Sequence, residues 1–378
     1  MTMQRKAHGF TFVDLVLVLI ITGALLGLLL PALASSAADA KANTCQDRMR
    51  QIGLALRNFE LGNREFPPAS FNPSLIAFHP ADCRPADASG GKSTTGYSWV
   101  VRILPQLGEN NLFNNIAEKS QRFAIKKGPF DPTVVTKDEA SLHVAAISLQ
   151  ELICPEWAGN KYTRDRTTID VGRTANADEP ANQGAPEYAT IDAALPGIGV
   201  ASFKGRVGPT SYKPMVGTHV VVGMPAENGG MVLTGTNGLT MGDFPDGTSK
   251  TILICESKEC GYASWYDGTL NWLVGNDTNK PAPSADDKPP WINAALALNK
   301  GFDPKAADSL PYLKKANSAN RPKNDVWWGP SSDHANGIVY HVFVDDHVLG
   351  ITDACDAATY LALITRDGGE PIDVMKIK

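Results

Sequence analysis

The N-terminal region of the chain carries a long apolar run. No charged residue occurs between Leu15 and Ala38, and residues 15–30 read LVLVLIITGALLGLLL. At 1.5 Å per residue, a helix over the uncharged stretch would be about 36 Å long, which is enough to cross a bilayer. Arg5 and Lys6 precede the run, so the positive-inside rule keeps that end in the cytoplasm. We therefore predict one inner-membrane span at about residues 15–38, with everything after it periplasmic or extracellular.

The helical pattern continues beyond the apolar run. Apolar side chains recur at helical spacing, with arginines off that stripe, at Cys45, Met49, Ile52, Leu56 and Phe59. Gly62-Asn63 supplies a C-cap signal and Pro67-Pro68 cannot continue a helix. One helix over residues 10–62, in lipid first and amphipathic later, is predicted.

A cleaved secretory signal is the alternative for this region, because small residues between Ala32 and Ala38 offer a cleavage site. Two features disfavour it. Asp14 stands at the start of the apolar run, where an ordinary signal sequence has no use for an acid. The amphipathic pattern also continues past the cleavage site, which indicates a retained helix.

The rest of the chain, residues 63–378, shows the pattern of a mixed domain. Short β-branched or apolar runs bounded by turn residues predict strands at His219–Gly223, Met231–Leu233, Thr251–Cys255 and Ile338–Val344. Short helices are predicted around residues 111–118 and 356–366, and polar or proline-rich loops at 164–197 and 281–290. The predicted fold class is α+β: a long N-terminal helix followed by a globular domain with a mainly antiparallel sheet and long loops.

Composition narrows the class of protein. Of 378 residues, 43% are apolar and 20% charged, which is typical of a globular protein. The formal net charge is -5, and no basic run is interleaved with aromatic residues. A nucleic-acid partner is therefore not expected.

The cysteines leave two readings open. There are six, at Cys45, Cys83, Cys154, Cys255, Cys260 and Cys355. An exported domain permits disulfides among them, with pairing undetermined, and buried reduced thiols are the equal alternative. No C-x-x-C pair and no Cys/His cluster with zinc spacing occurs, so we predict neither a thiolate metal site nor any cofactor.

Catalytic motifs are missing from the sequence. Ser332-Asp333-His334 holds three catalytic residue types, but neighbours in sequence point in different directions, and a triad is assembled from distant segments. No G-x-S-x-G, H-E-x-x-H or dinucleotide fingerprint occurs. We predict that the protein is not an enzyme and has no catalytic residues.

Histidines and aspartates crowd the segment around residue 340. His334, His341 and His347 lie near Asp333, Asp345 and Asp346 in the sequence. These residue types can bind a divalent ion, but a solvated hairpin rim is the favoured interpretation. The turn at residues 246–249 could likewise supply oxygens to a calcium ion, but its composition is that of an ordinary turn.

Tryptophans concentrate in the last third of the chain. Those that could form a platform for a sugar or a protein are Trp265, Trp272, Trp327 and Trp328. Core packing is the expected role of most of them.

The segment Gly9-Phe10-Thr11-Phe12-Val13-Asp14 resembles the prepilin signal, with a short basic leader over residues 1–9. The resemblance implies cleavage between Gly9 and Phe10 by a prepilin peptidase, methylation of the new N-terminus, and assembly with other pilin-like subunits, as in type II secretion. The family usually has Glu where this chain has Asp14. A carboxylate there would neutralise the new α-amino group of the same or a neighbouring subunit.

Several later segments, in order, resemble the family called domain of unknown function 1559. They are Cys45 to Pro68, Ser98 to Pro105, Cys154-Pro155, Asp246 to Glu256, His334 with Gly337, Asp345, and Thr365 to Glu370. The family's late motif is a His, nine residues and Asp-Gly; here ten residues separate His334 from Asp345, and Asp346 replaces the Gly. We interpret this motif as a hairpin turn in which Asp346 must tolerate positive φ.

Two functions follow from these patterns. The first is a pseudopilin-like structural or interaction protein that displays an extracytoplasmic domain on a membrane helix. The alternative is a monomeric, membrane-tethered module that binds a glycan or a protein through the tryptophan-rich third. An extracytoplasmic hydrolase is a distant third hypothesis.

Overall fold

The computed structural model describes residues 12–71, 97–120, 122–123, 147–157, 208–221, 224–233, 237–258, 264–266, 268, 271–277, 280, 282–284, 288–300, 329–372 and 374–377. Within these ranges, the side chains of residues 28–38 and 220–225 are not described. Gly9, Phe10, Cys83, Cys260, Trp327 and Trp328 lie outside the described residues, as does the predicted loop at 164–197.

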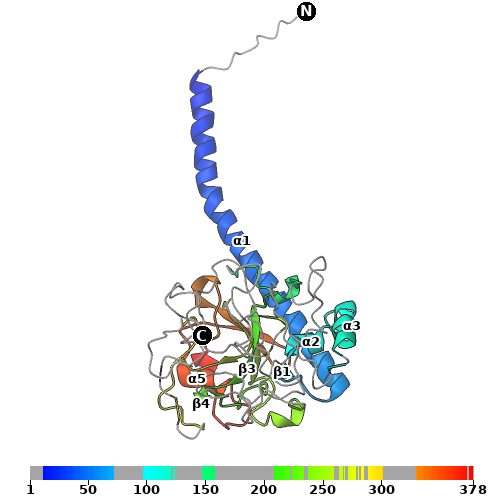
Figure 1. Cartoon of the computed structure of the whole chain (residues 1–378). Helices are drawn as coiled ribbons and strands as arrows, with labels where there is room; N and C mark the ends of the chain where they lie inside the picture. The colour runs from blue at the N-terminus through cyan, green and yellow to red at the C-terminus, as the bar shows by residue number, and fades with distance from the viewer. Residues whose placement is uncertain are drawn as a thin grey trace, which may run out of the picture.

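The first element is a single helix, α1 (Phe12–Asn63), of 52 residues. Its N-terminal half extends away from the globular domain, and its C-terminal half lies against that domain (Figure 1). The residue that takes the left-handed conformation after the helix is Arg64, with φ 64°, rather than the predicted Gly62. Its amide donates to the Glu60 carbonyl at 2.6 Å, which closes the last turn. Among the described residues, no helix has the length and hydropathy of a membrane span.

The central sheet has five strands in the order β7-β3-β6-β8-β9. They are β7 (Leu273–Val274), β3 (Tyr212–Gly217), β6 (Ile252–Glu256), β8 (Val339–Phe343) and β9 (Val348–Ile351). All neighbours are antiparallel except β3 and β7, which are parallel. The described residues therefore form the mixed helix and sheet fold with a mainly antiparallel sheet that the sequence predicts.

Shorter elements surround the sheet. Two small antiparallel pairs are β1 (Ser70–Phe71) with β2 (Tyr97–Ser98), and β4 (Val220–Val221) with β5 (Met224–Pro225). The other helices are α2 (Trp99–Ile103), α3 (Asn110–Lys119) and α5 (Ala357–Ala362), with 3-10 turns η2 (Gln150–Leu152), η3 (Met241–Asp243), η4 (Ala335–Gly337) and η5 (Val374–Lys376). Asp356 caps α5 by accepting from the Thr359 amide at 2.9 Å, as its sequence indicates.

The sequence prediction of strands was partly wrong. Residues 231–233 form no named strand, although the Met231 amide donates to the Met215 carbonyl at 3.1 Å. Strand β3 was missed, because Pro214 lies inside it and proline argues against a central strand. The fold accommodates this proline because the pairing of β3 with β7 begins only at Met215. No β7 residue therefore needs a hydrogen bond from the proline nitrogen.

The sheet is buried on both faces. One face packs with the stripe of α1 that holds Met49, Ile52 and Leu56, while the other packs with Tyr360 and Leu361 of α5. A register shift between Ile252 and Ile254 lets β6 contribute consecutive residues to the α1 side. Beyond this shift the strand alternates again, which points Glu256 and Ile254 to the same side.

Strands β8 and β9 form the predicted hairpin, but the turn differs in detail. The Phe343 amide donates to the His347 carbonyl at 3.0 Å, so residues 344–346 form a three-residue connection rather than a two-residue turn around Asp345-Asp346. Asp346 has φ 70°, the positive φ that was expected at this position.

Gly53 lies on α1 where the helix crosses β8. A Cβ at this position would come within 2.9 Å of Val342 Cγ1 and 3.3 Å of the Asp346 carbonyl oxygen. We predict that Gly53→Leu lowers the free energy of unfolding by about 1–3 kcal/mol, because overpacking separates helix and sheet. The measurement is urea unfolding of the full chain in detergent.

The matched control is Gly62→Leu, at a helical glycine with nothing within 4 Å of a Cβ. This change should be neutral or stabilising, since leucine is the better helix former by up to about 1 kcal/mol. Equal stability of the two variants would contradict the close approach of α1 to β8.

The turn at Asp346 gives a second prediction. Replacing Asp346 by Val should destabilise the protein by about 1–2 kcal/mol, because a β-branched residue is strained at φ 70°. Asp346→Gly should be neutral or stabilising. Thermal unfolding of the two variants beside the unchanged chain measures the difference, and a valine variant as stable as the glycine variant would refute the positive φ.

Candidate metal centre

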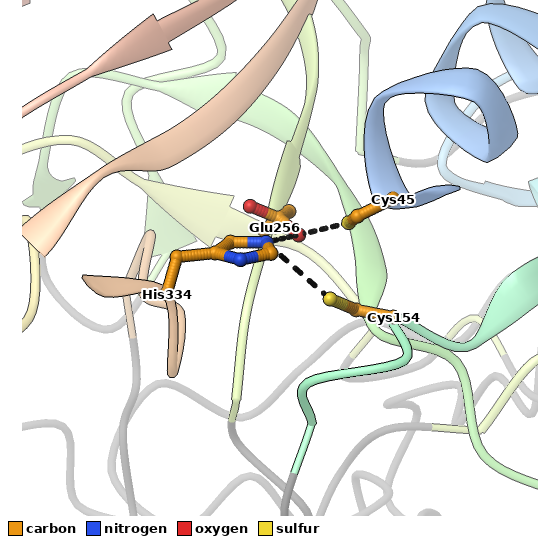
Figure 2. A group of neighbouring side chains, drawn as sticks. All are labelled: Cys45, Cys154, Glu256 and His334. Atoms are coloured by element: carbon orange, nitrogen blue, oxygen red, sulfur yellow. Dashed lines mark hydrogen bonds and ion pairs between the residues drawn. The ribbon is translucent and has the colours of Figure 1, made fainter. Parts of the chain in front are cut away.

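Four side chains from separate parts of the chain meet beside the sheet. They are Cys45 on α1, Cys154 after η2, Glu256 at the end of β6, and His334 at the N-cap of η4 (Figure 2). Their donor atoms all lie within 4.8 Å of one another, and all four residues are buried. Among the described residues, this is the one such group of histidine, cysteine and acidic side chains.

The local structure explains how each side chain is placed. Cys45 belongs to the buried stripe of α1, and Glu256 follows the alternation of β6 toward the same side. The Cys154 amide donates to Ser211 Oγ at 3.0 Å, and the Arg48 guanidinium donates to the carbonyl of Ile153. The segment before Cys154 is thereby held against α1.

Short contacts connect the four donor atoms. The Cys45 thiol donates to Glu256 Oε1 at 2.5 Å, and His334 Nε2 lies 3.1 Å from the same oxygen. Cys154 Sγ lies 3.4 Å from His334 Nε2. In Figure 2 the carboxylate of Glu256 lies next to the Cys45 sulfur and the imidazole of His334 faces the Cys154 sulfur, so that all four groups face one small volume.

A second set of contacts orients the group. Glu156 Oε2 lies 2.7 Å from His334 Nδ1, so Nδ1 carries a proton for this carboxylate and Nε2 faces the cysteines. The Tyr340 amide donates to Glu256 Oε2 at 2.8 Å, which leaves Oε1 directed at the group. The Tyr212 hydroxyl lies 3.2 Å from Cys45 Sγ.

Burial and hydrogen bonding shift the protonation of these groups in different directions. Burial raises the pKa of Cys45 far above its ordinary value. The hydrogen bond from Cys45 lowers the pKa of Cys154, although burial opposes this. Burial would lower the pKa of His334, but hydrogen bonds to Cys154 and Glu256 raise it to about 11. Without a metal, burial therefore favours the protonated thiol of Cys45, and the hydrogen bonds favour the protonated imidazole of His334.

This arrangement can support three kinds of chemistry. Two thiolates, an imidazole and a carboxylate can bind a metal ion, and two adjacent thiols can form a disulfide. Cys154, His334 and Glu156 could also act as a nucleophile, its base and the acid that orients the base. Cys154 is only 5% exposed and Cys45 is fully buried. Reactive cysteines are partly exposed, so the burial disfavours attack on a substrate.

The sequence predicted parts of this group but not the group. Cys45 and Cys154 were disulfide candidates and His334 a motif residue, whereas Glu256 was only the end of a family segment. The prediction that there is no thiolate metal site rested on local Cys/His spacing. That signal does not detect donors assembled from four distant segments.

The other cysteines that the structure describes do not join the group. Cys255 and Cys355 are buried with free thiols, as are Cys45 and Cys154. The described cysteines therefore form no disulfide in this structure. Cys83 and Cys260 lie outside the described residues.

The tryptophan platform is not supported by the described residues. Trp265 and Trp272 are 0% and 1% exposed, so neither faces a ligand. The Trp265 indole donates to the Ile147 carbonyl at 2.7 Å, which explains how its polar atom is accommodated in the core.

The hairpin residues also separate. Asp345 pairs with His347 at 2.5 Å on the exposed turn, and Asp333 pairs with Lys258 at 3.5 Å. Gly337, with φ 67°, lies against Asp353 rather than against the hairpin turn. Asp246 accepts from the amides of Gly368 and Gly369 at 2.6 and 2.9 Å, so its carboxylate anchors the C-terminal segment.

Together, the fold and site define an α+β domain built on one long helix, with a buried Cys/His/Glu group where the helix meets the sheet. The sequence profile described as "Protein of unknown function (DUF1559)" matches residues 38–358, and the chain belongs to this family. No curated protein and no solved structure gives a match.

His341, on the face of the sheet away from α1, provides a pH-dependent prediction. Its Nδ1 donates to the Val339 carbonyl at 2.9 Å and its Nε2 accepts from the Tyr360 hydroxyl at 2.8 Å. Complete burial lowers the pKa of His341 to about 3. Since an unfolded histidine has a pKa of about 6.5, the unfolded state binds the extra proton, and stability is lost as the pH falls below about 6.5.

We expect His341→Gln to reduce the pH dependence of the unfolding free energy between pH 6.5 and 4 by up to about 1.4 kcal/mol per pH unit. Urea unfolding at several pH values measures this slope. The control is His347→Gln, because the His347 side chain is 42% exposed. An unchanged slope in His341→Gln would contradict a neutral, buried imidazole.

Proposed function

We propose that this protein is a pilin-like subunit that is anchored in the inner membrane by α1 and displays its globular domain outside the cytoplasm. The observation that carries the proposal is the division of one continuous helix into two unlike halves. The first half projects from the domain with apolar side chains, and the second half is part of the domain core (Figure 1).

In the projecting half, the described side chains of residues 12–27 are apolar except for Asp14 and Thr22. Phe12 is 79% exposed and Leu19 and Ile20 are each 63% exposed, and the neighbouring leucines, valines and isoleucines up to Leu26 are exposed as well. Exposing apolar surface to water is unfavourable by about 25 cal/mol per Å². A helix that is apolar all round therefore calls for an apolar environment. We propose that this environment is lipid before assembly and the equivalent helices of other pilin-like subunits afterwards.

The packed half explains how the domain would be carried. Met49, Ile52 and Leu56 are fully buried against the sheet. Arg57 also pairs with Glu60 at 3.0 Å, next to the end of the helix. Because helix and sheet share one core, a displacement of α1 would move the whole domain, as a subunit of a short fibre requires.

The start of α1 supplies the feature that separates a subunit from a simple anchor. Asp14 lies in the first turn of the helix. In the proposal, prepilin peptidase cleaves before Phe10, and the Asp14 carboxylate neutralises the new amino group of the same or a neighbouring subunit. The domain itself is proposed to be non-catalytic.

The alternative, a monomeric module that binds a glycan or protein, has less support. Two of its four tryptophans, Trp265 and Trp272, are buried in the core. The other two lie outside the described residues, so the described surface offers this hypothesis no aromatic platform.

N-terminal analysis of the protein from its native membrane tests the proposal. We expect an intact mass that corresponds to a methylated chain beginning at Phe10. We further expect Asp14→Ala to abolish co-purification with other pilin-like subunits while membrane retention persists, because only the charge pairing is removed.

Two variants act as controls for the role of Asp14. Asp14→Glu should preserve co-purification, and so should Asp39→Ala, which removes another exposed acid of the same helix. A chain that begins at Met1 or near Ala38, or an Asp14→Ala variant that assembles normally, would overturn the subunit hypothesis.

A further inference from the structure

We propose that Cys45, Cys154, Glu256 and His334 bind one zinc ion, which fastens α1 to the globular domain. The inference is independent of the proposed membrane role, since the four donors meet in the domain whether or not the first half of α1 enters lipid. The donor set, its geometry, its supporting contacts and its burial each point to this ion.

The donor set has the chemistry that zinc prefers. Structural zinc sites are tetrahedral and are built from cysteine sulfur, histidine nitrogen and, less often, carboxylate oxygen. Thiolates disfavour magnesium and calcium, which take oxygen ligands. Four protein donors also complete the coordination, so that no position remains for water or a substrate, and the site is a structural one.

The distances agree with a tetrahedral site that closes slightly in the absence of the ion. Typical zinc-ligand bond lengths place neighbouring donors about 3.4–3.8 Å apart. The Cys154–His334 contact of 3.4 Å is at this value and the His334–Glu256 contact of 3.1 Å is close to it. The Cys45 thiol still carries its proton and donates it to Glu256 Oε1, and this contact, at 2.5 Å, is shorter than an ordinary thiol–carboxylate hydrogen bond. Zinc would displace this proton and separate the two donors.

The surrounding contacts are those of a ligand shell. Metal-bound histidines usually donate their second ring N–H to a carboxylate or carbonyl, which fixes the ring and its tautomer. Glu156 occupies this position, 2.7 Å from His334 Nδ1. The second oxygen of Glu256 is held by the Tyr340 amide at 2.8 Å, and a hydroxyl of Tyr212 lies 3.2 Å from Cys45 Sγ. Each of these contacts directs a donor atom toward the centre of the group.

The burial of these ionisable side chains explains why the group needs a cation. The side chains of His334 and Glu256 are each only 2% exposed, and Cys45 is fully buried. Such a group of ionisable side chains is costly to bury unless its charges are neutralised. A divalent ion would neutralise two thiolates, and the carboxylate adds a further favourable contact.

The first experiment measures metal content. The full chain is purified in detergent under reducing conditions without metal-affinity resin, dialysed against micromolar zinc, and analysed by inductively coupled plasma mass spectrometry. We expect about one zinc per chain, and replacement by Co²⁺ should give the visible absorption of a tetrahedral thiolate site. Less than about 0.1 zinc per chain, with no cobalt spectrum, would overturn the proposal.

Variants assign the ion to this group. Cys154→Ser and His334→Ala should each lose the zinc, whereas Cys255→Ser and Cys355→Ser, which alter buried free thiols elsewhere, should keep it. Because a ligand variant could also fail to fold, Glu156→Gln is included, since it leaves all four donors in place. We expect this variant to fold and to bind zinc 10- to 100-fold more weakly in competition with a chelator.

The same samples separate the rival chemistries. A Cys45–Cys154 disulfide in protein from its native compartment, seen as a linked peptide pair by mass spectrometry, would overturn the zinc assignment. Rapid alkylation of Cys154 in the zinc-loaded full chain would do the same, because it would show an accessible thiolate. Protection of both cysteines that is lost on chelation would support it.

Discussion

One face of α1, from Cys45 to Phe59, lies against the central sheet, and the remaining parts of the structure are arranged around this contact. The helix brings Met49, Ile52 and Leu56 into the same core as Tyr212, Ile254 and Val342. Gly53 allows the helix backbone to approach β8 where a larger side chain would meet Val342. The contact covers one side of a sheet that is apolar on both sides, so the sheet depends on the helix for its burial.

The same contact explains why the candidate metal centre lies where it does. Cys45 is the first buried residue of the α1 stripe, and the part of α1 that projects from the domain lies N-terminal to this stripe. The other three donors come from β6, the segment after η2 and the N-cap of η4. The group therefore joins the start of the buried part of α1 to three segments of the globular domain.

The sequence predicted the parts of the fold that depend on local pattern. The amphipathic stripe of α1, the strands around residues 252 and 339, and the helix capped by Asp356 all follow from periodicity and capping residues. Strand β3 was not predicted, since Pro214 argues against a strand and only the absence of a β7 partner beside it makes the strand acceptable. The candidate centre was not predicted because its donors are related by tertiary contacts alone; no local spacing connects Cys45 with Glu256.

The chemistry of the four donors and their neighbours is unlike that of an ordinary core. Two cysteine sulfurs, an imidazole and two carboxyl groups lie close together in a region from which water is largely excluded. Buried ion pairs of this kind add little to stability by themselves, because the loss of hydration offsets much of the attraction. An apolar set of similar volume would secure α1 to the sheet equally well. Glu156 and the Tyr340 amide hold the ring nitrogen and the carboxylate oxygen that point away from the centre of the group. A bound ion therefore explains the four strong donors better than packing alone does.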